Sequence, residues 1–307
     1  MHFTVAGRRA IGLIWINRAG GRHNFLLRMK CPRQVLLICG LLVYGCAPLA
    51  PTPGATFAFG VLGDTPYSDN EARALDGLIE RLSAQDLAFV VHVGDIGTSA
   101  PDQACGDAWL EARARQFAAI RHPFILLPGD NEWTDCAKHG MDPQIRLAAW
   151  RRLFCHDARG LALERQPGQC ENVRWQADGM AFIGLNVPGG GSPDLHDARM
   201  AATLEWLDES LALAESRDDR RIVVFLHADP RFERVGRDDD YARLRAVLAT
   251  HAAWFKGRLI LVHGDTHFYR DDEPVPGMRR LEPWGAPFVS WLRVSPAGDA
   301  LRVQAGW

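Results

Sequence analysis

Six residues that can bind a metal ion stand at the ends of apolar stretches of the sequence. These stretches cover residues 56–64, 87–95, 123–130, 221–227 and 258–265, and each ends in an aspartate or a histidine. The six residues are Asp64, Asp95, Asp130, His227, Asp265 and, two positions further on, His267. Four carboxylates cannot gather in one cleft without compensation, because like charges repel and burial makes each charge costlier. Two divalent cations would supply the compensating charge.

Each aspartate also has a simpler explanation. Asp and Gly favour the turns that follow strands, and four of the aspartates come directly after a glycine. One or two such coincidences are common in any protein. Six residues in this arrangement favour a metal site over a set of unrelated turns.

The apolar stretches alternate with segments that have a helical pattern. The stretches are rich in β-branched residues, which is typical of strands covered on both faces. Ser68 and Glu71 form a capping box before one predicted helix, and apolar residues at helical spacing predict two more near 200–211 and 244–254. This alternation predicts an α/β fold, in which ligands bind at the carboxyl ends of the strands. Residues 180–187, 288–294 and 301–303 are further strand candidates, and the last two predict an antiparallel addition, hence a mixed sheet or a second sheet.

The order of these residues resembles the five-block signature of the calcineurin-like metallophosphoesterase superfamily, which is D-x-H, G-D, G-N-H-[DE], a strand-end His and G-H-x-H. Here the blocks read Gly63-Asp64-Thr65-Pro66, Gly94-Asp95, Gly129-Asp130-Asn131-Glu132, His227 and Gly264-Asp265-Thr266-His267. The resemblance covers about residues 56–270. It implies a sandwich of two mixed β-sheets flanked by helices, with the domain extending over 56–307.

The resemblance also implies a role for each matching residue. One metal would be held by Asp64, Asp95 and His267, and Asp95 would bridge to a second metal held also by Asp130, His227 and Asp265. The sequence departs from the signature at several positions. Pro66 replaces a histidine ligand, Asp130 an asparagine ligand, Asn131 a catalytic histidine and Asp265 a histidine. Tyr67 is the candidate to fill the gap at Pro66.

The activity implied is hydrolysis of a small phosphoester, either a monoester or a diester. Two divalent ions would lower the pKa of a bound water, and the resulting hydroxide would attack phosphorus. Asn131 and Glu132 are candidate catalytic residues. His139 is the candidate proton donor, because an asparagine cannot release a proton at neutral pH. The oxygen-rich ligand set favours Mn²⁺, with Mg²⁺, iron and zinc as alternatives.

A second function class stays open at this point. The departures at Pro66 and Asn131 are compatible with a degenerate family member that binds a phosphate- or sugar-containing ligand in the cell envelope without hydrolysing it. No G-x-S-x-G motif and no phosphate-binding G-x-x-x-x-G-K-[ST] loop occur in the sequence.

The first 46 residues have the character of an export signal. They hold seven basic and no acidic residues, and the apolar run 34–45 is too short to span a bilayer, which needs about 20 residues. Met29 lies shortly before this apolar run and is the favoured true start of the protein. The run ends in Leu42-Val43-Tyr44-Gly45-Cys46, which resembles a lipobox in which Cys46 is lipidated. A plain signal peptide is the alternative, and residues 47–55 read as a flexible tether. We therefore expect an exported protein in the periplasm or envelope, with no membrane contact beyond this leader or lipid anchor.

Export would change the interpretation of the seven cysteines, because disulfides form in oxidising compartments. Three lie in the leader, which leaves an even four that allow three pairings. The favoured pairs are Cys105–Cys136 and Cys155–Cys170, because both are local. A thiolate metal site is disfavoured by the absence of any C-x-x-C spacing.

The composition is that of an ordinary globular protein of 307 residues, with 47% hydrophobic residues and a net charge of −2. Without the basic leader, 28 basic residues face 37 acidic ones. This balance gives no reason to expect a nucleic-acid partner, and we expect a monomer.

Overall fold

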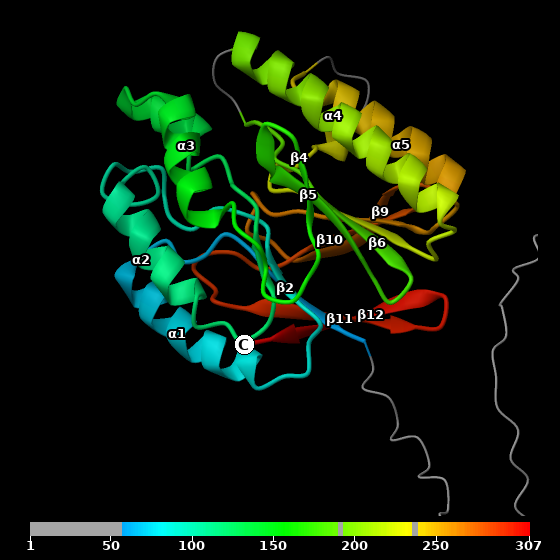
Figure 1. The fold of residues 1–307 in the computed structure, drawn as a ribbon, viewed down its shortest axis with the longest axis horizontal. Helices are drawn as coiled ribbons and strands as arrows, with labels where there is room; N and C mark the ends of the chain where they lie inside the picture. Colours follow the sequence, from blue (N-terminus) through cyan, green and yellow to red (C-terminus); the bar gives the residue numbers. More distant parts are fainter. Residues whose placement is uncertain (1–56, 190–192, 235–238) are drawn as a thin grey trace, which may run out of the picture. The chain divides into compact units, whose positions relative to one another are not determined.

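The structure, a computed structural model, describes residues 57–189, 193–234 and 239–307. The predicted leader 1–46, with Met29 and Cys46, and the tether 47–55 lie outside the described residues. The described part is built of two mixed β-sheets with helices on their outer sides (Figure 1). This arrangement confirms the sandwich predicted from the sequence.

The first sheet has the strand order β12-β11-β1-β2-β3. Three strands run parallel, namely β1 (Phe59–Leu62), β2 (Val90–His92) and β3 (Phe124–Leu126). The hairpin of β11 (Trp291–Ala297) and β12 (Ala300–Gly306) adds antiparallel to β1, as predicted. The carboxyl ends of the three parallel strands therefore meet at one edge.

The second sheet has the order β4-β5-β6-β7-β8-β10-β9. Four of its strands, β6, β7, β8 and β10, run parallel, and antiparallel strands complete both sides. The bounds are β4 (Glu164–Gln166), β5 (Gln169–Ala177), β6 (Met180–Gly184), β7 (Ile222–Phe225), β8 (Leu259–Val262), β9 (Arg270–Val275) and β10 (Met278–Glu282). The sequence patterns predicted β6, β7 and β8 but not the other four.

Each sheet has its own helical cover. The first packs against α1 (Asp69–Ser83), α2 (Asp107–Phe117) and α3 (Pro143–Phe154), and the second against α4 (Pro193–Ser216) and α5 (Ala242–Phe255). Figure 1 shows α4 and α5 side by side on one side of the sheets and α1 and α2 on the other. Two short 3₁₀ helices, Thr134–His139 (η1) and Phe232–Arg234 (η2), lie in loops.

The start of α1 follows from its sequence. The Ser68 side chain accepts a hydrogen bond from the backbone amide of Glu71, and a Glu71 carboxylate oxygen accepts one from the backbone amide of Tyr67 (2.7 Å). These contacts satisfy amides at the helix start that have no partner inside the helix. The Ser68 half of the predicted capping box is confirmed, whereas the Glu71 carboxylate bonds the amide one residue before the N-cap.

The core between the sheets follows from strand alternation. Phe59 and Val61 of β1 face the opposite sheet, where Phe182 and Phe225 pack against Phe59. The next residue, Leu62, instead packs under the helices of its own sheet. This two-sided burial explains why the strands read as continuous apolar runs.

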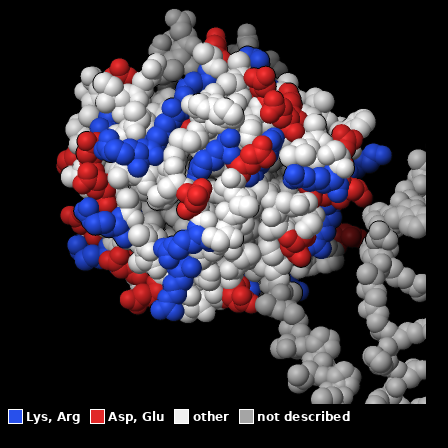
Figure 2. All heavy atoms as spheres, viewed as in Figure 1, with Lys and Arg blue, Asp and Glu red and all other residues white. Residues whose placement is uncertain are grey.

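The four cysteines of the described part form the two favoured disulfides, Cys105–Cys136 and Cys155–Cys170. Both bridges are compatible with an exported protein. Within the residues the structure describes, no helix combines the length and apolarity that crossing a bilayer requires. On the face drawn in Figure 2, basic and acidic side chains are interspersed.

Candidate metal centre

The ends of five strands bring the predicted ligands together. Asp64, Asp95 and Asp130 follow β1, β2 and β3 of the first sheet, and His227 and Asp265 follow β7 and β8 of the second. The site therefore lies where the carboxyl ends of the two sheets meet, which is the expected place for a ligand.

Distances between side chains confirm the convergence. His227 Nε2 lies 3.3 Å from Asp95 Oδ1 and 3.7 Å from Asp130 Oδ1. His267 Nε2 lies 3.7 Å from Asp64 Oδ1, which also accepts a hydrogen bond from the backbone amide of Asp265 (3.0 Å). All six ligands predicted at the strand ends thus belong to one cluster.

The cluster contains two sets of potential metal ligands. Asp64, Asp95 and His227 offer ligand atoms within 4.8 Å of one another, and Asp130, His227 and Asp265 do the same. A third set elsewhere includes Cys155 and Cys170. Because those two sulfur atoms form a disulfide, they are not available as thiolate ligands.

Burial and crowding shift the pKa values of this cluster. Burial raises the pKa of Asp95 well above its usual range, and the carboxylates of Asp130, Glu132 and Asp64 raise it further against the attraction of His227. Burial lowers the pKa of His227, but the charge of Asp95 raises it more strongly, so this pKa lies well above its usual value. The cluster would thus take up protons where it lacked a cation.

Buried atoms without partners show that these residues fit a metal. Within the described part of the chain, Asp64 Oδ2 and His227 Nδ1 are buried and make no hydrogen bond. Such orphaned groups are rare in protein interiors because each forfeits its solvation. Carboxylate and imidazole are suitable ligands for a divalent ion, and Asp130 and His267 remain 25% and 27% exposed, so solvent reaches the site.

The backbone of the cluster is held in an uncommon conformation. Asp64, Asp95, Asp265 and His267 have φ angles of 53°, 58°, 78° and 66°, in the left-handed region that non-glycine residues seldom occupy. Each such residue costs on the order of 1 kcal/mol, and residues of this kind concentrate at functional sites. The fold therefore holds four ligands in place against local strain.

Solved structures share this architecture. A dimetal phosphatase from Danio rerio matches with a TM-score of 0.55 at 14% sequence identity, over 81% of this chain and 96% of the phosphatase. The protein has the calcineurin-like metallophosphoesterase fold. A putative 5'-nucleotidase from Staphylococcus aureus matches at a TM-score of 0.47 and 16% identity, over 82% of this chain and 53% of its own length. The chain thus spans about half of that nucleotidase. No protein-family model matches the sequence, and neither does any curated protein sequence.

Tyr67, the candidate to fill the gap at Pro66, and Asn131, which replaces a histidine of the signature, both contact Asp95. The Tyr67 hydroxyl donates to Asp95 Oδ2 (2.6 Å) and lies 3.3 Å from His267 Nε2. Asn131 donates from Nδ2 to Asp95 Oδ2 (2.7 Å) and from its backbone amide to Asp95 Oδ1 (3.1 Å). Both residues therefore lie in the cluster and orient Asp95.

Glu132 lies beneath the cluster. It is fully buried, and its carboxylate accepts hydrogen bonds from the backbone amides of Asp95, Ile96 and Gly129. Burial raises its pKa to about 7. These contacts tie the loop after β2 to the loop after β3, which the sequence alone did not indicate.

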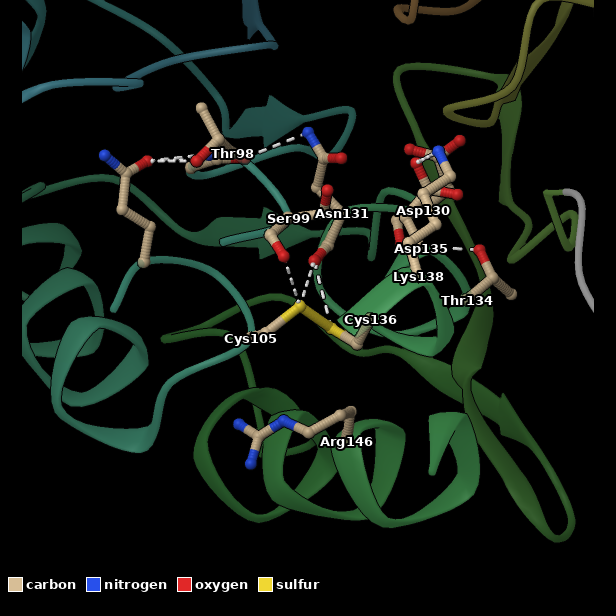
Figure 3. The surroundings of a disulfide bond; sticks show 12 residues. Thr98, Ser99, Cys105, Asp130, Asn131, Thr134, Asp135, Cys136, Lys138 and Arg146 are labelled. Atoms are coloured by element: carbon tan, nitrogen blue, oxygen red, sulfur yellow. Dashed lines mark hydrogen bonds and ion pairs between the residues drawn. A yellow bond between two sulfur atoms is a disulfide. The ribbon is translucent and has the colours of Figure 1, made fainter. Parts of the chain in front are cut away.

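A disulfide supports the same two loops from the other side (Figure 3). The carbonyl oxygen of Asn131 lies 3.4 Å from the sulfur atoms of both Cys105 and Cys136. Gly129 allows the loops to approach, because a Cβ at this position would lie 1.9 Å from Asp95 Oδ1. The disulfide and the close approach at Gly129 therefore both hold the Asp130–Asn131 turn in place.

His139 is the remaining residue of the predicted site. It is the last residue of η1, its side chain is exposed, and within the described residues no hydrogen bond or ion pair links it to the ligands. His92 also lies outside the cluster: it is buried, with Nε2 2.9 Å from the carbonyl oxygen of Thr65.

Two parts of the site were missed by sequence reasoning. The backbone amide of Asp229 donates to Asp265 Oδ2 (3.0 Å), and the segment 283–288 lies across Asp64 and His267. In that segment the Ala286 amide donates to the Asp64 carbonyl oxygen (2.8 Å). The sequence offered one signal for this segment. Residues 284–288 read Trp-Gly-Ala-Pro-Phe, and an exposed turn seldom carries two large aromatic residues unless they have a role.

Proposed function

We propose that the protein is a metal-dependent phosphoester hydrolase that uses two divalent ions. The observation that carries this proposal is the pair of overlapping ligand sets, in which the buried Asp64 Oδ2 and His227 Nδ1 have no hydrogen-bond partner. The fold supports it, since a dimetal phosphatase shares this architecture and ligands in α/β folds bind at the carboxyl ends of the strands.

One ion would be held by Asp64, His267 and Asp95, and the other by Asp130, His227 and Asp265, with Asp95 shared. A carboxylate has two oxygens and can therefore bridge two ions. His227 belongs to both close sets, but an imidazole nitrogen binds a single ion. Asp95 Oδ1 lies 3.3 Å from His227 Nε2, so Asp95 reaches both sets and is the residue that we propose both ions would share. Bound ions supply positive charge to phosphoryl oxygens and lower the pKa of water.

The chain's own residues orient this assembly. Asn131 and Tyr67 fix the Asp95 carboxylate, and Glu132 holds the backbone on both sides of it. We assign Glu132 to positioning, because its oxygens are occupied by backbone amides and it is fully buried. His139 is exposed at the end of η1, and in our proposal it donates the proton to the leaving group.

Manganese is the proposed metal. The cluster has four aspartates and two histidines, a ligand set richer in hard oxygen donors than zinc sites usually are. Elemental analysis of the protein purified without added metal would test this assignment. Tightly bound zinc as the sole metal contradicts it.

The activity is tested with p-nitrophenyl phosphate and bis-p-nitrophenyl phosphate in the presence of Mn²⁺. Asp95→Asn keeps the size of the side chain but removes the charge, and we expect at least a hundredfold loss of kcat/KM. Asp86→Asn, an exposed residue outside the cluster, is the matched control and should keep full activity. Turnover that survives Asp95→Asn or chelation refutes the proposal.

One observation favours a second candidate, a protein that binds a phosphate-containing ligand without hydrolysis. Asn131 Nδ2 already donates to Asp95, to the Tyr67 hydroxyl (3.1 Å) and to the Gly97 carbonyl oxygen (3.0 Å). Both of its N–H groups are therefore engaged, and it has none free to stabilise a leaving group by a hydrogen bond. Metal-dependent binding of inorganic phosphate without turnover in Mn²⁺, Mg²⁺ or Zn²⁺ identifies this candidate.

We also propose that the mature protein is exported and anchored through a lipid on Cys46. The two disulfides are compatible with export. Mass spectrometry of the mature N-terminus, compared between the wild type and Cys46→Ser, tests the anchor. An unmodified N-terminus downstream of residue 46 in the wild type refutes it.

A further inference from the structure

Exposed aromatic rings gather beside the metal centre. Of the six large hydrophobic side chains exposed among the described residues, four lie in one strip: Phe268 (65%), Tyr269 (37%), Phe288 (47%) and Trp307 (59%). Isolated exposed rings need no explanation, but a contiguous group on a monomer's surface usually marks a binding site.

Trp284 joins these rings into one surface, which we call the aromatic strip (Phe268, Tyr269, Trp284, Phe288 and Trp307). Trp284 lies 6.3 Å from Phe268, 6.3 Å from Tyr269 and 5.4 Å from Phe288, and Phe288 lies 6.2 Å from Trp307, all between ring centroids. The Trp284–Tyr269 pair is stacked, with 25° between the planes. The strip is thus a continuous series of ring contacts that remains open to solvent.

The aromatic strip is continuous with the metal centre. Phe268 and Tyr269 directly follow His267, and Trp284 directly precedes Gly285. A Cβ on Gly285 would lie 2.4 Å from Asp64 Cβ and 3.0 Å from His267 Cγ, so the backbone there touches both ligands. The strip therefore begins where a phosphoryl group bound at the metals would end.

We propose that the aromatic strip binds the leaving group of the phosphoester and selects a flat aromatic ring there. This inference rests on the proposed function, because it assigns the substrate class of the same site. A flat ring can stack on exposed aromatic faces and bury apolar area on both partners. Such pairs contribute more than their buried area alone, whereas a saturated ring of the same size cannot stack in this way.

The test measures binding and so does not depend on turnover. Benzylphosphonate and cyclohexylmethylphosphonate carry the same non-hydrolysable phosphoryl group on a flat and a saturated ring, respectively. Calorimetry with the Mn²⁺-loaded protein should show about fivefold tighter binding of benzylphosphonate. In Trp284→Leu, which keeps an apolar side chain, this ratio should fall to near one. Trp254→Leu is the matched control, because Trp254 is 63% exposed on α5 outside the strip.

The outcomes separate this inference from the proposed function. Binding of both phosphonates without discrimination, or a ratio unchanged in Trp284→Leu, overturns the inference alone. An unchanged ratio together with a loss of dimers or of vesicle binding in Trp284→Leu overturns it and assigns the strip to a second copy or to a membrane. Failure of both phosphonates to bind overturns the proposed function and the inference together. Discrimination that is lost in Trp284→Leu supports the inference, whereas discrimination without hydrolysis of any ester rejects the enzyme and with it the leaving-group role of the strip.

Discussion

Removal of the Cys105–Cys136 disulfide should weaken both the stability of the fold and the binding of metal. The bridge contacts the carbonyl oxygen of Asn131, whose backbone and side-chain amides hold the Asp95 carboxylate. In Cys105→Ser/Cys136→Ser this support is lost and the turn gains freedom. The second disulfide, Cys155–Cys170, provides the control, since it has no contact with the ligands among the described residues.

The two disulfides should have similar effects on stability. They join residues 31 and 15 positions apart. The loop-closure entropy of the unfolded chain then gives about 3.7 kcal/mol for the first bridge and about 3.0 kcal/mol for the second. Loss of one hydrogen bond to the charged Asp95 should make metal binding less favourable by about 1.5 kcal/mol. This corresponds to a roughly tenfold weaker affinity, and only for the first bridge.

The assay is calorimetric titration with Mn²⁺ at a temperature where circular dichroism shows both double-serine variants to be folded. Urea unfolding measures the free energy of unfolding in parallel. We expect both variants to lose about 3 kcal/mol of stability and only the Cys105/Cys136 variant to lose metal affinity. Equal Mn²⁺ affinity in the two variants would refute the view that this bridge positions Asp95.

Three further predictions follow from single side chains. Tyr67→Phe removes the hydroxyl that bonds Asp95, so elemental analysis should find less bound metal, and unchanged metal content would remove Tyr67 from the ligand set. Burial lowers the pKa of His92 to about 4 from an ordinary 6.5, so the free energy of unfolding should fall by roughly 3 kcal/mol as the pH drops from 6.5 to 4. The fall arises because only the unfolded chain takes up the proton, and urea unfolding of His92→Gln should show a flatter pH dependence. Glu132→Gln replaces an acceptor oxygen by a donor facing backbone amides, which should lower the free energy of unfolding by about 2 kcal/mol in the same assay.

The parts of this fold that could be predicted from sequence are those with a strong local signal. The buried strands read as apolar runs because both faces are covered, and five of them lead to a candidate ligand because the chain turns there. The capping box at Ser68 and the two local disulfides are likewise short-range features. Short-range patterns therefore located both the fold and most of the candidate site.

The parts that could not be predicted depend on contacts between distant segments. The acidic run 271–273 is exposed, but it also belongs to β9, an edge strand that the apolar patterns did not predict and whose charges pair across to the neighbouring β10. Asp271 pairs with Arg279, and Asp272 pairs with Arg280. Charged residues are common on edge strands because they discourage further pairing. The role of Glu132 was hidden for a related reason, since two of the amides it binds lie 36 and 37 residues away.

The distance along the chain between the ligands determines when the site can form. Asp64 Oδ1 is hydrogen-bonded to the amide of Asp265, 201 residues later, and His267 follows two residues after that. A nascent or translocating chain therefore has no complete site until its last strands have emerged and both sheets have closed. If the chain crosses a membrane unfolded, it takes its metal from the compartment where folding ends. The metal supply of that compartment, as well as ligand chemistry, would then decide which ion the protein holds.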